Sequence, residues 1–186
     1  MRQWRVDQQP RVRWRNDGGF TREIISEPPG SAAFHWRVSV AEVEASGPFS
    51  SFDGYTRVLV LLDGAGMALL RTDTGEVTTV RPDDPMARFP GDAPIHAELL
   101  DGPTTDFNLM WRTDLLAAEA HCCAGCQEFS GGAPGQLVGG YVMTGSAVAG
   151  GKRLEAGELF VSDPGERLGL QVDGRVVHFL VGPITG

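Results

Sequence analysis

The amino-acid sequence predicts an all-β protein, a sandwich or barrel with two similar halves. Short apolar segments recur along the 186 residues, and turn-forming residues separate them. The 25 glycines and 12 prolines are many for a helical protein and suit numerous short strands joined by turns. Residues 61–70 also resemble residues 142–149, and residues 89–102 resemble residues 160–174. This internal likeness indicates two barrel-like halves.

Residues 34–43 form the clearest predicted strand, because apolar and polar side chains alternate along them. The polar face carries Arg37 and Ser39. These side chains are ligand candidates if that face lines the mouth of a barrel, and ordinary surface residues if it faces solvent.

The other strands of the first half are predicted from apolar runs that end at turn signals. They cover residues 24–25, 57–62, 67–71, 77–80, 95–100 and 106–112. Asp-Gly pairs at residues 63–64 and 101–102 mark tight turns. The last strand alternates, with Asp106, Asn108, Met110 and Arg112 on one face.

The second half begins with residues 115–128, the best candidate for a helix, with Asp114 as its N-cap. An irregular segment fits these residues equally well. Residues 137–144 are a predicted strand, and residues 145–151 a glycine-rich hairpin region. Residues 168–172 and 176–181 are predicted to pair as a hairpin around an Asp-Gly turn.

The charge balance argues against nucleic acid as a partner. The net charge is −8, from 24 acidic and 16 basic residues, and phosphate binding needs a basic surface. Lys152 is the only lysine, so arginine carries nearly all of the positive charge. Arginine suits planar carboxylate recognition, although a codon bias would give the same composition.

No membrane segment or secretory signal is predicted. The first nine residues are polar and charged. Residues 129–151 form the longest uncharged run, but Pro134 and several glycines interrupt it too often for a transmembrane helix. The 3 cysteines agree with a reducing compartment. We therefore expect a cytoplasmic protein without a membrane partner.

The sequence gives little support for a metal or a catalytic nucleophile. The histidines are His35, His96, His121 and His178, and no two have the short spacing that places metal ligands on one face. A Gly-x-Ser-x-Gly elbow and a phosphate-binding Gly-Lys-Ser/Thr loop are both lacking from the sequence. We expect neither a metal nor a cofactor.

A denser group of candidate ligands follows His121. Cys123 and Cys126 have Cys-x-x-Cys spacing, and His121 and Cys122 could complete four zinc ligands. The second Cys-x-x-Cys that would make the signal strong is missing, and no thioredoxin-like context supports redox use. Thiols in a connecting segment are the simpler interpretation.

A ligand site is most strongly suggested by residues 14–24, which pass through a Gly18-Gly19 turn into polar residues. Glycine allows the chain to bend there and bring polar groups together, although a plain polar turn would look the same. Arginine, amide and hydroxyl groups suit a small anion. The polar candidates are Asn16, Thr21, Arg22, Glu23, Arg37, Ser39, Arg57, Asp106, Asn108 and Arg112. Apolar walls could come from Trp14, Trp36, Phe49 and Met110, although each also suits a core.

Four segments together resemble the HutD/Ves family. They are Trp-Arg-Asn-Asp-Gly-Gly-Phe-Thr-Arg-Glu-Ile at residues 14–24, Phe-His-Trp-Arg-Val-Ser at residues 34–39 with Ala41 and Val43, Ser-Gly-Pro-Phe-Ser at residues 46–50 through Gly54 and Arg57, and Asp-Phe-Asn-Leu-Met at residues 106–110. Their order and spacing agree over residues 14–112, and the cysteine segment lies outside the match. Asp17 stands where this family commonly has glycine.

The resemblance implies a bicupin, with two cupin-like double-stranded β-helix barrels in one chain, no metal, and frequent pairing as a homodimer. The expected domains are an N-terminal barrel over residues 1–113, a connecting segment over residues 114–136, and a C-terminal barrel over residues 137–186 completed by strands from the N-terminal part. Ser50 also matches the family. The ligand-binding residues that the resemblance implies are Asn16, Thr21, Arg22, Glu23, Arg37, Ser39, Arg57 and Asn108.

HutD members accompany bacterial histidine-utilisation enzymes, and Ves members are linked to stress and cold. The resemblance therefore favours a non-enzymatic regulatory protein that binds a small carboxylate of histidine degradation, such as urocanate, formiminoglutamate or formylglutamate. A metal-free isomerase or hydrolase with Glu23 as general base is the alternative. An interaction module acting through a dimer surface is a third hypothesis.

Overall fold

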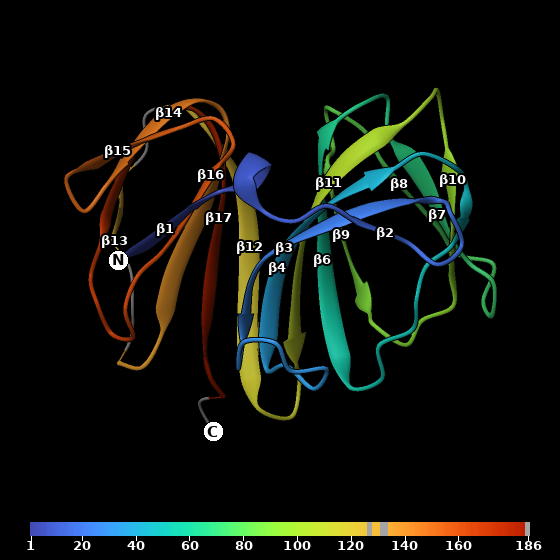
Figure 1. Ribbon diagram of the computed structural model, residues 1–186, viewed down its shortest axis with the longest axis horizontal. Coiled ribbons are helices and arrows are strands. Elements are labelled where there is room, and N and C mark those ends of the chain that lie inside the picture. The colour runs from blue at the N-terminus through green and yellow to red at the C-terminus, as the bar shows by residue number, and fades with distance from the viewer. Residues whose placement is uncertain (126–127, 131–133, 185–186) are drawn as a thin grey trace. The chain divides into compact units, whose positions relative to one another are not determined.

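The chain forms antiparallel strands in two units. A computed structural model describes residues 1–125, 128–130 and 134–184 (Figure 1). One unit is Pro10–Asp114, and the other combines Met1–Gln9 with Leu115–Gly186. The helical structure within the described ranges is a single 3-10 turn, Val6–Gln8. The all-β prediction is confirmed.

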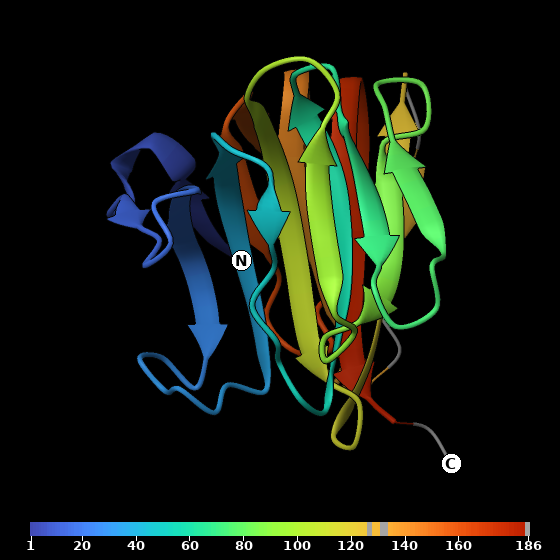
Figure 2. The ribbon, with the colours of Figure 1, turned by 90° about the vertical axis from the view of Figure 1, so that its right-hand side faces the viewer.

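The unit Pro10–Asp114 contains two sheets. The larger has the order β2 (Val12–Arg13), β3 (Gly19–Glu27), β4 (Trp36–Val43), β11 (Thr104–Arg112), β6 (Tyr55–Asp63), β9 (Met86–Pro90). The smaller has the order β5 (Gly47–Pro48), β10 (Ile95–Leu99), β7 (Met67–Arg71), β8 (Val77–Val80). The green strands of the smaller sheet lie in front of the larger sheet in Figure 2. Leu59 and Phe89 from one sheet share a buried core with Met67 and Leu69 from the other.

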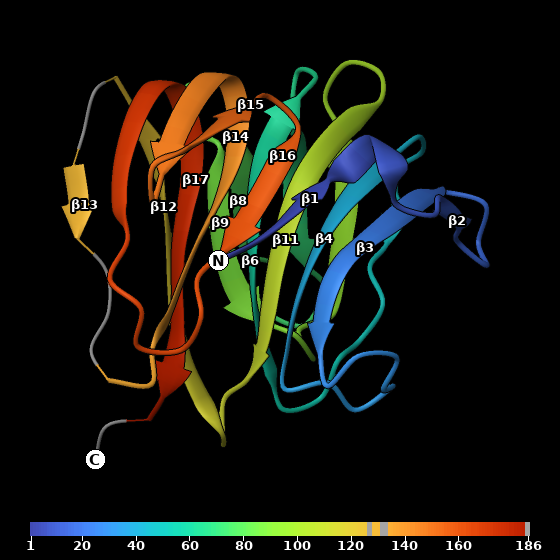
Figure 3. The same cartoon turned by 60° about the vertical axis from the view of Figure 1, so that its left-hand side comes forward.

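The second unit is built on one seven-stranded sheet. Its order is β1 (Arg2–Arg5), β16 (Glu158–Val161), β14 (Leu137–Ala149), β17 (Gly169–Pro183), β12 (Leu116–Ala124), with β15 (Lys152–Glu155) on β14 and β13 (Glu128–Ser130) on β17. The first strand of the chain, β1, lies beside β16 (Figure 3).

The units differ in their bounds from the expected domains. Met1–Gln9 groups with the C-terminal residues, because β1 pairs with β16 from Arg2 opposite Val161 to Arg5 opposite Glu158. Residues 114–136 were expected as a connection, but they include β12, which is a strand of the same sheet.

The helix considered for residues 115–128 is absent from the described part of that segment, where β12 pairs with β17. Alternate residues of β12 are more and less exposed, as in a strand with one covered face. Asp114 does not cap a helix, because its carboxylate accepts hydrogen bonds from Arg112 at 2.8 and 2.5 Å. Cross-strand pairing has overridden the local helix signal.

The hairpin expected around Asp173-Gly174 is wrong, because β17 continues through both residues as one strand. It pairs with β14, which likewise runs through Gly145 to Ala149 before turning. Gly174 lies opposite Gly145, and a Cβ atom on Gly174 would lie 2.1 Å from the carbonyl oxygen of Thr144. The two glycines therefore let two long strands pass closely, where the sequence suggested a turn.

Cys122 and Cys123 are adjacent in β12 and therefore point to opposite faces of the sheet. Cys126, and residues 131–133 of the glycine-rich connection, lie outside the described residues. Within the described ranges, no three His, Cys, Asp or Glu side chains are grouped as a metal site would need. The described chain also contains no helix of the length and apolarity that crossing a bilayer requires.

Candidate functional site

A cavity of about 870 Å³ opens within the unit Pro10–Asp114. Six of the eight predicted ligand-binding residues line it: Asn16, Thr21, Arg37, Ser39, Arg57 and Asn108. Arg22 and Glu23 are not among the lining residues. The volume lies within the ordinary range for small-molecule sites.

The register of three strands explains why these side chains meet. Ser39 on β4 pairs with Asn108 on β11, and Arg37 pairs with Met110. Met110 in turn pairs with Arg57 on β6. Paired residues on adjacent strands point to the same face of a sheet, so alternate positions of β4 and β11 line one wall.

Arg57 is the most buried arginine of this wall, with only 8% of its surface exposed. Its Nη2 atom donates to Oδ1 of Asn108 at 3.0 Å, and its guanidinium lies 5.0 Å from the ring centre of Phe49 and 5.2 Å from that of Phe89. Burial lowers the pKa of Arg57 to about 10, so the side chain remains charged at neutral pH. Its buried Nε atom has no hydrogen-bond partner among the described residues.

Arg37 supplies a second guanidinium. It lies 4.5 Å from the ring centre of Phe34 and 5.2 Å from that of Phe52, and its Nη2 atom lies 3.3 Å from the sulfur of Met110. Burial lowers the pKa of Arg37, and the charge of Glu23 acts in the opposite direction. The described residues offer no hydrogen-bond partner to its Nε atom either.

Asp106 is the carboxylate of the cavity wall, and it is only 1% exposed. Its Oδ1 atom accepts a hydrogen bond from Nδ2 of Asn108, and its Oδ2 atom has no partner within the described structure. Burial raises the pKa of Asp106 to about 7, against the opposing effect of Arg57 and Asn108. Asn108 thus bridges the carboxylate and Arg57.

Arg22 and Glu23 are not among the lining residues although they follow Thr21 directly. Arg22 Nε lies 3.4 Å from a carboxylate oxygen of Glu42. Glu23 has 47% of its side chain exposed, accepts a hydrogen bond from Ser26 at 2.8 Å, and lies 3.8 Å from Arg37. Alternation along β3 turns Arg22 to the face opposite Thr21, whereas Glu23 lies opposite Ser39 and is on the same face as Thr21.

A rim hairpin, defined here as β2, the turn at residues 14–18 and the start of β3, forms one edge of the cavity. Trp14 Nε1 donates to Oγ1 of Thr21 at 2.7 Å, and the Gly18 amide donates to Oδ1 of Asn16 at 3.2 Å. A Cβ atom on Gly19 would lie 2.2 Å from the carbonyl oxygen of Glu42, so this position requires glycine. Asn16 and Thr21 therefore have structural partners in addition to facing the cavity.

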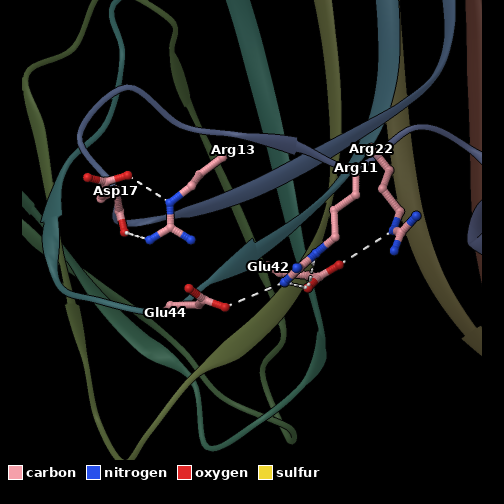
Figure 4. A network of polar contacts seen from close by, with 6 residues as sticks. All are labelled: Arg11, Arg13, Asp17, Arg22, Glu42 and Glu44. Carbon is pink, nitrogen blue, oxygen red and sulfur yellow. Dashed lines mark hydrogen bonds and ion pairs between the residues drawn. The ribbon is translucent and has the colours of Figure 1, made fainter.

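Ion pairs within the rim hairpin and between neighbouring residues are shown in Figure 4. Arg11 lies 2.6 Å from Glu42 and holds the pKa of that carboxyl below its ordinary value. The remaining pairs are Arg11 with Glu44 at 3.5 Å, Arg22 with Glu42 at 3.4 Å and Arg13 with Asp17 at 2.7 Å. Asp17 has a positive φ of 57°, which explains why glycine suits this position.

The apolar walls were predicted in part. Trp14, Phe49 and Met110 line the cavity, whereas Trp36 is buried but lies on the other face of β4. Arg112 also lies outside the lining and pairs with Asp114.

Sequence reasoning gave too little weight to Asp106 and missed Phe52. Asp106 shares the alternation of Asn108, so strand periodicity could have retained it. Phe52 lies outside the strands, and no periodic signal identifies it.

Three comparisons with known proteins agree over nearly the whole chain. A family model described as HutD matches residues 6–179. An uncharacterised 21.2 kDa protein from the hutC 3′ region of Pseudomonas putida is 33% identical over 176 residues, covering 92% of this chain and 92% of the relative. The structure of HutD from Pseudomonas fluorescens SBW25, in the formate condition, matches with a TM-score of 0.87 and 30% identity, covering 99% of both chains.

A more distant structural match concerns the fold alone. A variant of Bacillus subtilis oxalate decarboxylase matches with a TM-score of 0.64 and 8% identity, covering 97% of this chain and 76% of that chain. Together with the HutD match, it confirms the expected cupin-like fold of the bicupin type.

Proposed function

Because the chain belongs to the HutD family, which is linked to histidine utilisation, we propose that it is a regulatory protein that binds a small carboxylate metabolite in the cavity of the unit Pro10–Asp114. The candidate ligands are urocanate, formiminoglutamate and formylglutamate. The proposed role requires binding and release of the metabolite, without a chemical step.

The observation that carries the proposal is the buried, incompletely paired guanidinium of Arg57. A buried charge is costly unless it is paired, and Asn108 provides only a neutral partner. A ligand carboxylate in the cavity would supply charge-assisted hydrogen bonds to this guanidinium. The rings of Phe49 and Phe52, which line the cavity beside Arg57, suit the apolar part of such a metabolite.

The charges of the cavity lining support an anionic ligand. Four arginines line it, Arg13, Arg15, Arg37 and Arg57, together with one carboxylate, Asp106. The cavity is therefore positive although the whole chain has a net charge of −8. A local positive site in a negative protein favours anions that are small enough to enter it.

The alternative enzyme with Glu23 as general base receives no support from this geometry. Glu23 lies outside the cavity lining, and its carboxylate is occupied by Ser26 and Arg37. A general base must come within hydrogen-bond reach of the substrate proton that it removes.

Thermal unfolding with each candidate metabolite tests the proposal. At a ligand concentration of about 100 times Kd, binding should stabilise the protein by about 2.7 kcal/mol. Arg57→Met should abolish this shift, and Arg37→Ala should reduce it. Arg88→Met is the matched control, because Arg88 lies on β9, is exposed and does not line the cavity. Equal shifts in wild type and Arg57→Met, or no shift with any of the three metabolites, would contradict the proposal.

A further inference from the structure

Asp106 has one carboxylate oxygen for which the cavity wall provides no partner. Oδ1 accepts the amide hydrogen of Asn108, whereas Oδ2 is buried and has no hydrogen bond within the described residues. Natural proteins rarely leave a buried polar atom unpaired, so such an atom in a cavity wall indicates a missing partner. The missing hydrogen-bond partner belongs to Oδ2, because Oδ1 is already paired.

The bridge through Asn108 decides which oxygen can carry a proton. The amide oxygen of Asn108 accepts from Arg57, so its amide nitrogen must face Asp106. Oδ1 is therefore an acceptor, and a proton on the carboxyl group belongs on Oδ2. A protonated Oδ2 becomes a hydrogen-bond donor, which the carboxylate of a ligand can accept.

We propose that Asp106 selects anions by taking up one proton from solvent when the anion binds, and that its Oδ2–H group then donates to the ligand carboxylate beside Arg57. This inference rests on the proposed carboxylate-binding function and adds a specificity residue to it. The ligand stays ionised, and the carboxyl group of Asp106 becomes neutral.

The electrostatics of the cavity favour this exchange. An incoming carboxylate repels an ionised Asp106 and is attracted by Arg57, so protonation removes the unfavourable contact. The raised pKa of Asp106, about 7, places its proton uptake in the neutral range.

Asp106 is the carboxylate of the cavity lining, whereas Glu23 on the neighbouring β3 lies outside the lining, 3.8 Å from Arg37. On β4, Ala41 lies opposite Asp106 and Arg37 is the charged residue of the lining; on β6, Leu61 lies opposite and Arg57 is the charged residue. The rim hairpin adds Arg13 and Arg15. Arginine stays protonated throughout the neutral range, so Asp106 is the residue of this lining that titrates there.

Isothermal titration calorimetry with formate and N-formyl-L-glutamate at pH 6 and pH 8 tests the inference, because neither carboxylate titrates in this range. If only the protonated form of Asp106 binds, Kd should rise about tenfold from pH 6 to pH 8. At pH 8, two buffers of different ionisation enthalpy should report the uptake of nearly one proton for each ligand bound.

Two substitutions of Asp106 distinguish proton uptake by its side chain from an effect on folding. Asp106→Asn keeps a neutral group that donates hydrogen bonds, so its Kd should change less than about twofold between the two pH values. Asp106→Leu removes the donor and should weaken binding at both pH values. Thermal unfolding of each variant without ligand confirms that it is folded. Asp63→Asn is the matched control, since Asp63 is an exposed carboxylate at the end of β6 and should keep the wild-type pH dependence.

The outcomes separate the inference from the proposed function. Binding with the same Kd at pH 6 and pH 8, without proton uptake, overturns the inference and leaves carboxylate binding intact. A pH dependence that survives in Asp106→Asn also overturns it, because the titrating group is then another residue. If neither carboxylate binds the wild type at pH 6, the proposed function is contradicted and the inference falls with it.

Discussion

Both units have a packed core, but the unit Pro10–Asp114 also contains a large cavity with charged residues in its wall. In the unit Met1–Gln9 with Leu115–Gly186, Phe160 is fully buried among aliphatic side chains, and a Cβ atom on Gly140 would lie 2.5 Å from its ring. In the unit Pro10–Asp114, the corresponding kind of space is a cavity whose wall carries Arg57 and Asp106. A filled interior supplies stability, whereas a cavity with buried charge in its wall lowers it.

The largest expected loss of stability comes from removing a buried ring from the core of the unit that combines Met1–Gln9 with Leu115–Gly186. Phe160→Ala should lower the free energy of unfolding by about 3–5 kcal/mol, because it removes a fully buried ring and leaves a cavity. Phe52→Ala, beside Arg37 and Arg57, should cost much less because Phe52 is only partly buried and already borders open space. Urea denaturation of both variants measures the difference. Equal losses would show that the two interiors contribute alike.

The second-largest effect on stability is expected from the buried carboxylate of Asp106 in the cavity wall. The folded-state pKa of Asp106 is about 7 and its ordinary value is 3.8, so between these values the folded state binds more protons than the unfolded state. The contribution of Asp106 therefore falls as pH rises from about 4 to 7 and is constant above 7. Asp106→Asn should remove this fall and be more stable than wild type at pH 8 by on the order of 2–4 kcal/mol.

Urea denaturation of wild type and Asp106→Asn at pH 5 and pH 8 measures this effect. Asp73→Asn is the control, because Arg71 lowers the pKa of this exposed carboxylate and its removal should bring no gain at high pH. A stability difference between Asp106→Asn and wild type that does not grow with pH would refute a raised pKa.

A smaller effect is expected at the glycine pair of the rim hairpin. Gly19→Ala should destabilise by about 1–3 kcal/mol and weaken ligand binding, because its Cβ atom would displace the backbone of Glu42 and the ring of Trp14. Gly18→Ala should cost less than about 1 kcal/mol, since its Cβ atom would meet Asn16 at an ordinary 3.4 Å. Thermal unfolding with and without ligand distinguishes the two, and similar behaviour would contradict the packing argument.

The smallest effect is expected at Asp17. Asp17→Gly relieves the positive φ of 57° but loses the exposed ion pair with Arg13. The net result should be a stabilisation of less than about 1 kcal/mol, whereas Asp17→Ala should destabilise because alanine tolerates this conformation poorly. High-precision calorimetry can resolve the opposite signs, and a gain with alanine would contradict the conformational explanation.

Strand alternation correctly predicted which residues of β4 share a face of the sheet. The polar face of residues 34–43 placed Arg37 and Ser39 together, and the structure puts both on the cavity wall. Arg22 and Glu23 follow Thr21 in the sequence, but alternation turns Arg22 to the other face, and the Glu23 carboxylate contacts Ser26 and Arg37 outside the cavity lining. Proximity in sequence does not determine which face of a sheet a residue occupies.

Features that depend on pairing between distant parts of the chain could not be predicted from the local sequence. The Asp173-Gly174 pair has the local form of a turn, and only its position opposite Gly145 shows that the strand continues. The burial of the Asp106 carboxylate and its hydrogen bond with Asn108 likewise arise from the packing of strands, and no local sequence pattern reveals them. Local sequence thus identified most strands, whereas the chemistry of the cavity depends on contacts between strands.

The position of β1 limits the order in which parts of the chain can fold during synthesis. This strand is synthesised about 150 residues before its partner β16, so it cannot form this pairing while the intervening chain emerges. Pro10–Asp114 is continuous in sequence and can fold as soon as it is complete. All residues of the cavity wall are therefore available before β16, the partner of β1, has been synthesised.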